Sequence, residues 1–243
     1  MKCLIIAAGQ GTRLRELAES KPLAPVAGRP LIEHVVRLAR AGGASSFVVA
    51  TGYRAEPLEA YVAELAERLA VPIQAARNVE WERPNGASVL AAAELLGEED
   101  YVLLMSDHLF DPAILAALIA TRRAEAGVTL AVDRDVASPL IDLDDATKVK
   151  LGPDRRIAAI GKTLTDYDAI DTGIFLATPA LAGAIRDAAA AGGTGSLSEG
   201  VQRLAEAGTA WAMPTAGEWW ADVDDAAALA RAEETMPERL ALS

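Results

Sequence analysis

The sequence predicts an α/β protein in which a mostly parallel central sheet is covered by helices on both faces, giving three layers. The first observation is a regular alternation of short apolar runs with longer segments of helical periodicity. That alternation is typical of β-α-β units, whose strands lie parallel. The second is that the first apolar run, over residues 2–8, has no polar break, which is the pattern of a strand buried on both faces. The third is size, because 243 residues, 51% of them hydrophobic, suffice for one such core.

The first half of the chain, residues 1–135, is expected to alternate between strands and helices. The expected strands are 2–8, 47–50, 72–76, 101–105 and 128–132. The expected helices are 30–41, 55–69, a segment ending near 96 and the 111–120 region. Ligands of such sheets bind beyond the carboxyl ends of the strands, so the loop after the first strand, Gly52 and Asn78 should lie along one edge.

The second half, residues 136–243, begins with short strand-like pieces. Segments 148–151 and 157–162 flank a Gly152-Pro153-Asp154 turn, which predicts a small β-hairpin laid over the sheet. Because the hairpin is too small to fold alone, we expect one domain, 1–243, with a ligand-binding half on each side of residue 135. The remaining expected elements are a strand over 169–176, a helix over 179–191, a helix begun by the capping pair Ser196 and Glu199, and a closing helix capped by Asp225.

The most informative stretch is the loop Gly9-Gln10-Gly11-Thr12-Arg13 after the first strand, with Lys21 shortly beyond it. Glycines let backbone N–H groups approach an anion, because no Cβ keeps the anion away. A guanidinium and an ammonium can then neutralise phosphate charges at the same point. The stretch lacks the lysine of a Walker loop and the third glycine of a dinucleotide-binding loop. It predicts a phosphate-binding loop of another kind, with a tight turn bearing surface charges as the alternative.

The charge balance and the single cysteine restrict the class of protein. The net charge of −12 argues against a nucleic-acid-binding or membrane-surface protein. An acidic protein that binds polyphosphates must concentrate its basic residues locally or use a divalent metal. With Cys3 alone there is no intrachain disulfide, and we expect a cytoplasmic protein in which this thiol is buried for packing. No apolar segment reaches the roughly 18 residues that span a bilayer, so no membrane insertion is expected.

Carboxylates at two places suggest a metal site. Asp107 follows the 101–105 strand, at the sheet edge where the phosphate loop lies, and is well placed to hold Mg²⁺. Capping of the next helix is the alternative for Asp107, but Asp111 precedes Pro112 and can serve as that cap. Asp222 and Asp224 alternate along an expected strand and so face one side, where two unpaired carboxylates repel unless a cation lies between them. His108 could orient Asp107 or contact a substrate.

Three strings carry a resemblance to a known family. They are Ala7-Ala8-Gly9-Gln10-Gly11-Thr12-Arg13, Lys21-Pro22-Leu23 and Gly28-Arg29-Pro30-Leu31-Ile32-Glu33. Together they resemble the signature of the sugar-nucleotide pyrophosphorylase-like nucleotidyltransferases, which join a nucleoside triphosphate to a phosphorylated small molecule. The resemblance implies a Rossmann-like α/β/α sandwich of the nucleotide-diphospho-sugar transferase type. It also implies a Mg²⁺ site formed by Asp107 with Asp222, Asp224 or both.

The resemblance assigns roles to further residues. Arg13 and Lys21 would be the catalytic cations, Arg13 at the β- and γ-phosphates and Lys21 at the α-phosphate. The expected nucleotide-binding residues are Ala7, Ala8, Gly9, Gly11, Thr12, Gly52, Asn78, Asn85, Gly86 and Ser88. The expected acceptor-binding residues are His108, Lys148, Lys162, Asp171 and Thr172. Helix capping is the alternative for Asn85 and Ser88, and an ordinary surface position is the alternative for Lys148 and Lys162.

Further strings indicate one branch of this family. Asn78-Val79-Glu80-Trp81-Glu82-Arg83, Met105-Ser106-Asp107-His108 and Gly161-Lys162-Thr163-Leu164 look like those of CTP:inositol-1-phosphate cytidylyltransferases, which make CDP-inositol. Pro84 stands where the family pattern has glycine, which leaves the choice between CTP and UTP open. The membrane-spanning synthase sometimes fused to these enzymes is not in this sequence, so a separate membrane synthase is expected to use the product.

Other functions on the same fold stay open at this point. The chemistry could act on phosphocholine, or on a hexose 1-phosphate with another nucleotide. A choline site would need an aromatic cage, and the sequence scatters its few aromatic residues. A non-catalytic nucleotide-sensing protein is a second alternative, but such a protein would be expected to lose Arg13, Lys21 or the aspartates.

Overall fold

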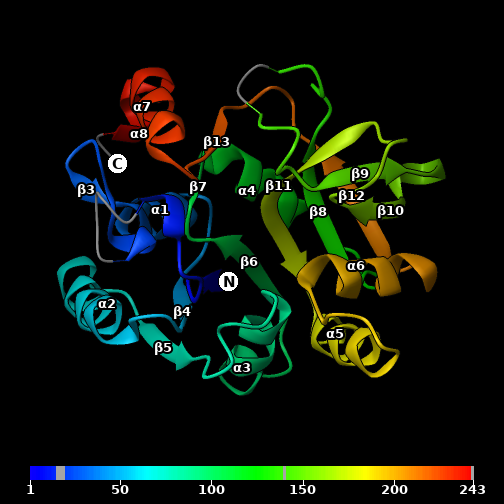
Figure 1. Ribbon diagram of the computed structural model, residues 1–243, viewed down its shortest axis with the longest axis horizontal. Coiled ribbons are helices and arrows are strands. Elements are labelled where there is room, and N and C mark those ends of the chain that lie inside the picture. Colours follow the sequence, from blue (N-terminus) through cyan, green and yellow to red (C-terminus); the bar gives the residue numbers. More distant parts are fainter. Residues whose placement is uncertain (15–19, 139–140, 242–243) are drawn as a thin grey trace.

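Four adjacent parallel strands form one end of the central sheet. The computed structural model describes residues 1–14, 20–138 and 141–241. A nine-stranded mixed sheet runs through it (Figure 1). The adjacent strands β6 (Tyr101–Met105), β1 (Lys2–Ile6), β4 (Ser46–Thr51) and β5 (Ile73–Arg77) are parallel, with Cys3 opposite both Phe47 and Val102. Their carboxyl ends therefore share one edge, as predicted from the β-α-β pattern.

The rest of the sheet is built around a long antiparallel strand, β11 (Ala169–Ala177). It pairs with β6 on one side and with β8 (Val128–Asp133) on the other, and β12 (Ala210–Pro214) adds to β8 in parallel. The predicted hairpin, β9 (Lys148–Leu151) and β10 (Ile157–Gly161), pairs with the start of β11. Apart from β10 and β11, these strands run in one direction, so the prediction of a mostly parallel sheet is confirmed.

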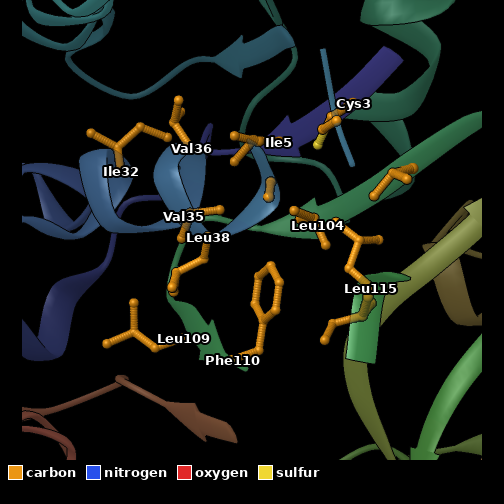
Figure 2. Packing of buried hydrophobic residues seen from close by; sticks show 14 of the residues in the cluster. Cys3, Ile5, Ile32, Val35, Val36, Leu38, Leu104, Leu109, Phe110 and Leu115 are labelled. Atoms are coloured by element: carbon orange, nitrogen blue, oxygen red, sulfur yellow. The ribbon is translucent and has the colours of Figure 1, made fainter. Parts of the chain in front are cut away.

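Helices cover both faces and complete the three layers. On one face α1 (Leu31–Ala41), α2 (Ala55–Leu69) and α4 (Pro112–Ala120) contribute to a cluster in which side chains such as Val35, Leu38 and Phe110 meet Ile5 and Leu104 of the sheet (Figure 2). On the other face α3 (Gly86–Leu96), α5 (Ala180–Ala190) and α6 (Leu197–Glu206) pack against a second apolar cluster. Cys3 lies in the first cluster without solvent exposure, as expected for a packing residue.

The predicted caps hold three helices in place. Asp111 accepts from the Ala113 N–H at the start of α4, and Ser196 and Glu199 form the capping box of α6. Asp225 accepts from the Ala228 N–H at the start of α7 (Ala226–Thr235). No described helix is long and apolar enough to cross a bilayer.

Several short elements were not predicted. They are β2 (Pro25–Val26), β3 (Arg29–Pro30), β7 (His108–Phe110), the edge strand β12, the short 3₁₀ helices and the terminal helix α8 (Glu238–Ala241). The strand expected to carry Asp222 and Asp224 is β13 (Trp220–Asp222), which ends before Asp224. The argument that both aspartates alternate along one strand was therefore wrong. Because β13 pairs with β7, which follows β6 after a two-residue turn, the C-terminal segment reaches the carboxyl edge of the sheet (Figure 1).

Candidate functional site

Two cavities open side by side at this edge of the sheet. The loop cavity, about 380 Å³, is lined by Ala7, Ala8, Gly9, Gly11, Thr12, Lys21, Trp81 and Ser88 among others. The large cavity, about 500 Å³, is lined by His108, Asp145, Lys162, Asp171, Trp219, Trp220 and Asp222 among others. Both cavities share Arg13, Asn85, Met105, Asp107 and Asp224. Molecules bound in the two cavities would therefore meet at these shared residues.

The two glycines of the predicted phosphate-binding loop have different structural roles. A Cβ on Gly9 would meet no atom within 4 Å, so this position is open toward the loop cavity. Gly11 has a φ of +55°, and a Cβ there would lie 2.3 Å from the Cβ of Lys21. Gly11 therefore makes room for the lysine side chain as well as for the turn.

Lys21 lies between two carboxylates. Its side chain, 9% exposed, donates to Asp107 Oδ2 at 2.5 Å and to Asp224 Oδ1. Burial alone would lower the pKa of Lys21, but the charges of Asp107 and Asp224 outweigh it and raise the pKa above its ordinary value. Burial likewise opposes ionisation of Asp107, yet Lys21 and His108 keep its pKa below the usual range. The lysine is thus a permanent cation at the junction of the two cavities.

A second ionic group connects Arg13 with Lys162. Arg13 Nη2 donates to Asp145 Oδ2 at 2.5 Å and to Asp224 Oδ2 at 3.2 Å. Lys162 Nζ donates to the other oxygen of Asp145, Oδ1. Hydrogen bonds from Lys162 and Arg13 hold the pKa of Asp145 well below its usual range, so this carboxylate is ionised at neutral pH. Asp145 was not predicted as a site residue.

His108 is fixed in one orientation beside two carboxylates. Its Nδ1 donates to the Thr172 carbonyl at 2.7 Å, and its Nε2 lies 3.5 Å from Asp222 Oδ2 and 3.8 Å from Asp107 Oδ1. Burial opposes its charged form, but the charges of Asp222 and Asp107 raise the pKa of His108 to about 10. Gly173 (φ +75°) permits this placement, because a Cβ there would lie 2.3 Å from the ring.

The side chains around His108 include oxygen ligands that suit a divalent cation. Asp107, His108 and Asp222 each have one potential ligand atom within 4.8 Å of the others, and His108 could use its Nε2 only after losing the proton there. Asp224 lies on the other side of Lys21. Repulsion between carboxylates also favours a bound cation. After burial, the charge of Asp222 is the main cause that raises the pKa of Asp224. Carboxylate oxygens suit Mg²⁺, which takes only one or two from a protein and completes its shell with water and phosphate oxygens.

Not all of the expected nucleotide-binding residues reach a cavity. Asn78 is buried and both ends of its amide are used, donating to Ser88 Oγ and accepting from Glu80 N–H. Gly52 leaves the space into which the Trp81 side chain packs, since a Cβ would lie 2.5 Å from the Trp81 Cβ. Gly52 and Asn78 therefore support the loop cavity from behind.

Asn85 and Gly86 lie at the start of α3 and connect it to α6. Asn85 does not cap its own helix; its Oδ1 accepts from the Leu197 N–H at 3.0 Å. A Cβ on Gly86 would lie 2.0 Å from the Gly195 carbonyl oxygen, so this glycine permits close packing against the loop before α6. Close approach to a flat ring, the reason expected from the sequence, is therefore not needed to explain Gly86.

Among the expected acceptor-binding residues, too, some line a cavity and others do not. Asp171 lines the large cavity, and burial raises the pKa of its carboxyl to about 6. Thr172 is fully buried and donates to the Ala131 carbonyl, so its hydroxyl does not face the cavity. Lys148 lies outside both cavities, where its ammonium donates to the Lys162 carbonyl and contacts the Tyr167 ring. Lys148 therefore positions the strand end that carries Lys162.

Trp219 and Trp220 pack against the first apolar cluster and also line the large cavity. Trp220 stacks against His108 with ring centroids 6.1 Å apart, and its Nε1 donates to Asp133 Oδ2 at 2.8 Å. Their position follows from the β7–β13 pairing, which the sequence did not predict. The polar residues around them in the sequence were the only signal of a role beyond packing.

Comparisons with known proteins agree with this geometry. The model of the MobA-like NTP transferase domain matches residues 3–197. A protein of Rubrobacter xylanophilus named "Bifunctional IPC transferase and DIPP synthase" is 38% identical over 95% of this chain and 50% of its own length. A protein of the same name from Thermococcus kodakarensis is 35% identical over 72% of this chain and 37% of its own. The chain thus spans half of these relatives or less.

Among solved structures, the inositol-1-phosphate CTP transferase from T. maritima superimposes with a TM-score of 0.83. The alignment covers 99% of this chain and 93% of that one at 22% sequence identity. At this identity the likeness establishes the fold.

Proposed function

The chain belongs to the MobA-like NTP transferase family, and we propose that it transfers a cytidylyl group from CTP to myo-inositol 1-phosphate, giving CDP-inositol and pyrophosphate. The relatives named IPC transferases and the T. maritima enzyme support this choice of substrates. Because those relatives carry two activities in their names and this chain aligns with half or less of their length, it would supply the transferase activity.

One observation carries the proposal: the two cavities meet at Arg13, Asp107 and Asp224, with Lys21 held between the two aspartates. A nucleotidyl transfer needs two phosphorylated molecules to meet at such a point, with cations beside the reacting phosphorus. CTP would occupy the loop cavity, and the acceptor would occupy the large one. In a chain of net charge −12, the positive charge for these phosphates would come from Arg13, Lys21 and Lys162, each of which pairs with an aspartate here.

The chemistry requires positioning more than covalent help. An oxygen of the acceptor's phosphate attacks the α-phosphorus in line, a new P–O bond forms, and pyrophosphate leaves with the electrons of the broken bond. Lys21 would neutralise charge at the α-phosphate, and Arg13 with the amides around Gly9 would hold the β- and γ-phosphates. Lys162 would place the acceptor's phosphate. That phosphate is already ionised at neutral pH, so no general base is needed.

A divalent metal would be held by Asp107 together with Asp222, Asp224 or both. Mg²⁺, when bound, offsets the negative charge of the phosphates during transfer. The Asp222 carboxylate has an oxygen within 4.8 Å of the potential ligand atoms of Asp107 and His108, while Asp224 already pairs with Lys21 and Arg13. Asp222 is therefore the better candidate for the second direct ligand.

The large cavity suits a polyhydroxylated acceptor. Asp171 and Asp133 offer carboxylate oxygens for hydroxyl groups, and an indole face can pack on the apolar side of a ring. One observation favours a second candidate, phosphocholine, because Trp219 and Trp220 line the same cavity and could contact a quaternary ammonium. The acceptor must therefore be tested directly.

The test is pyrophosphate release with Mg²⁺ and either CTP or UTP. The acceptor panel is inositol 1-phosphate, phosphocholine, glucose 1-phosphate and mannose 1-phosphate. We expect turnover with CTP and inositol 1-phosphate, and a loss of about 100-fold or more in Lys21→Met. Lys150→Met is the matched control, since Lys150 pairs with Asp166 and Asp168 outside both cavities. Turnover with another acceptor would overturn the substrate, and CTP binding with no turnover on any acceptor would indicate a nucleotide sensor.

A further inference from the structure

Asp145 joins two cations that the proposed function gives to different substrates. One of its oxygens accepts from Arg13 and the other from Lys162. The proposed function places Arg13 at the nucleotide's outer phosphates and Lys162 at the acceptor's phosphate. The carboxylate therefore holds the place that phosphate oxygens of both substrates would take.

Alternative roles for Asp145 agree less well with its contacts. It does not belong to the group of Asp107, His108 and Asp222 that could hold a metal, and both of its oxygens are occupied by cations. An ion pair kept mainly for stability would be expected to have partners shielded from solvent, because exposed pairs contribute little. Instead the side chains of Arg13, Lys162 and Asp145 are 50%, 59% and 31% exposed, and all three line the large cavity.

We propose that Asp145 is an internal competitor for phosphate that couples the binding of the two substrates. The inference rests on the proposed function for the identity of the substrates, but its physical content concerns phosphate alone. Whichever substrate binds first displaces Asp145 and leaves the other cation without its carboxylate. The second substrate then binds without having to displace that carboxylate, so each substrate tightens the other by the same factor.

The expected gain in substrate affinity follows from the solvent exposure of the Arg13–Asp145 and Lys162–Asp145 ion pairs. Ion pairs between partly exposed side chains are modest, and two of them must be broken here. We therefore expect each substrate to bind about threefold to tenfold more tightly when the carboxylate is removed. The mutual tightening seen in the unmodified protein should fall to a factor of about one in the same variant.

The experiment is a binding cycle by isothermal titration calorimetry on the full chain with Asp145→Asn. The probes are inorganic tripolyphosphate, which carries the nucleotide's phosphates without the base, and inorganic phosphate for the acceptor site; CTP is titrated in parallel. Because tripolyphosphate has no nucleotidyl group to transfer, it cannot react with phosphate, and the readout of this probe pair is independent of turnover. If the proposed function fails, CTP will bind no better than tripolyphosphate, whereas the effect of Asp145→Asn on tripolyphosphate will persist.

Asp144→Asn is the matched control. It removes the same charge from the same loop, but Asp144 is exposed, lies outside both cavities and forms no ion pair with the described residues. We expect its affinities and coupling to match the unmodified protein. Weaker or unchanged tripolyphosphate binding in Asp145→Asn, or equal tightening in Asp144→Asn, would overturn the proposal. Equal melting temperatures of the two variants exclude a folding artefact.

Discussion

The buried carboxylate of Glu33, which lies away from the candidate site, allows a direct test of how hydrogen bonds to a buried charge stabilise the fold. Its carboxylate, 3% exposed on α1, accepts from Arg37 Nε at 2.9 Å, from Arg68 Nη2 at 2.8 Å and from the Tyr61 hydroxyl. Burial opposes its ionisation, but these hydrogen bonds outweigh it and lower the pKa to about 2 from 4.5. Replacing Glu33 with Gln removes the charge and keeps the shape of the side chain.

The depressed pKa fixes both the size and the pH window of the effect. A carboxyl held at about 2 in the folded state, against 4.5, contributes on the order of 3 kcal/mol to the free energy of unfolding. Because the folded pKa is the lower one, this stabilisation is present above pH 4.5 and is lost as the pH falls toward 2. Between pH 6 and pH 3.5 the loss should be about 1.4 kcal/mol.

Urea unfolding of the unmodified protein and Glu33→Gln, followed by circular dichroism at pH 6, 5, 4 and 3.5, measures this directly. The variant should be less stable at pH 6, and the difference between the two proteins should shrink steadily as the pH falls. Subtracting the two free energies of unfolding at each pH cancels the contribution of every other carboxyl group, because both proteins share those groups. A difference that stays constant or grows toward pH 3.5 would refute the argument that these hydrogen bonds hold the Glu33 charge.

Three further predictions concern the loop cavity, the packing of α3 and the metal. Gly11→Ala should lower turnover at least about tenfold, because its Cβ would displace Lys21 and its φ is positive; retained turnover with an unchanged melting temperature would contradict this. Gly86→Ala should lose about 2–3 kcal/mol in urea unfolding, because its Cβ meets a backbone carbonyl, whereas Gly183→Ala on α5, with no atom within 4 Å, should gain about 0.5–1 kcal/mol. Chelation by EDTA should abolish pyrophosphate release and added Mg²⁺ should restore it; full activity in EDTA would exclude the metal site.

The architecture could be predicted from sequence because its signals are local. Uninterrupted apolar runs marked the central strands, and the caps Asp111, Ser196 and Asp225 use side chains within a few residues of the groups they bond. The edge strand β12 was missed because a five-residue run beside a helix carries little periodicity of its own. Its pairing with β8 is decided by the sheet already formed.

The site was predictable only where a residue lies in a recognisable string. Arg13, Lys21 and Asp107 stand in such strings, and the structure brings them to one point. Asp145 lies in none, and its partner Arg13 is 132 residues away, so only the folded chain reveals the pair. Thr172 and Asn78 show the opposite case, since polar residues near a sheet edge can have their hydrogen bonds satisfied inside the protein.

The C-terminal strand β13 also determines when the site can exist during synthesis. Lys21 and its partner Asp224 are separated by 203 residues, so a ribosome makes the phosphate loop long before the carboxylates that complete its surroundings. A nascent chain that ends before Trp219 already contains Lys21 and Asp107, but it has neither Asp222 nor Asp224. Completion of the charge cluster therefore waits for the last segment, and the partly made chain has a phosphate loop without its full set of carboxylates.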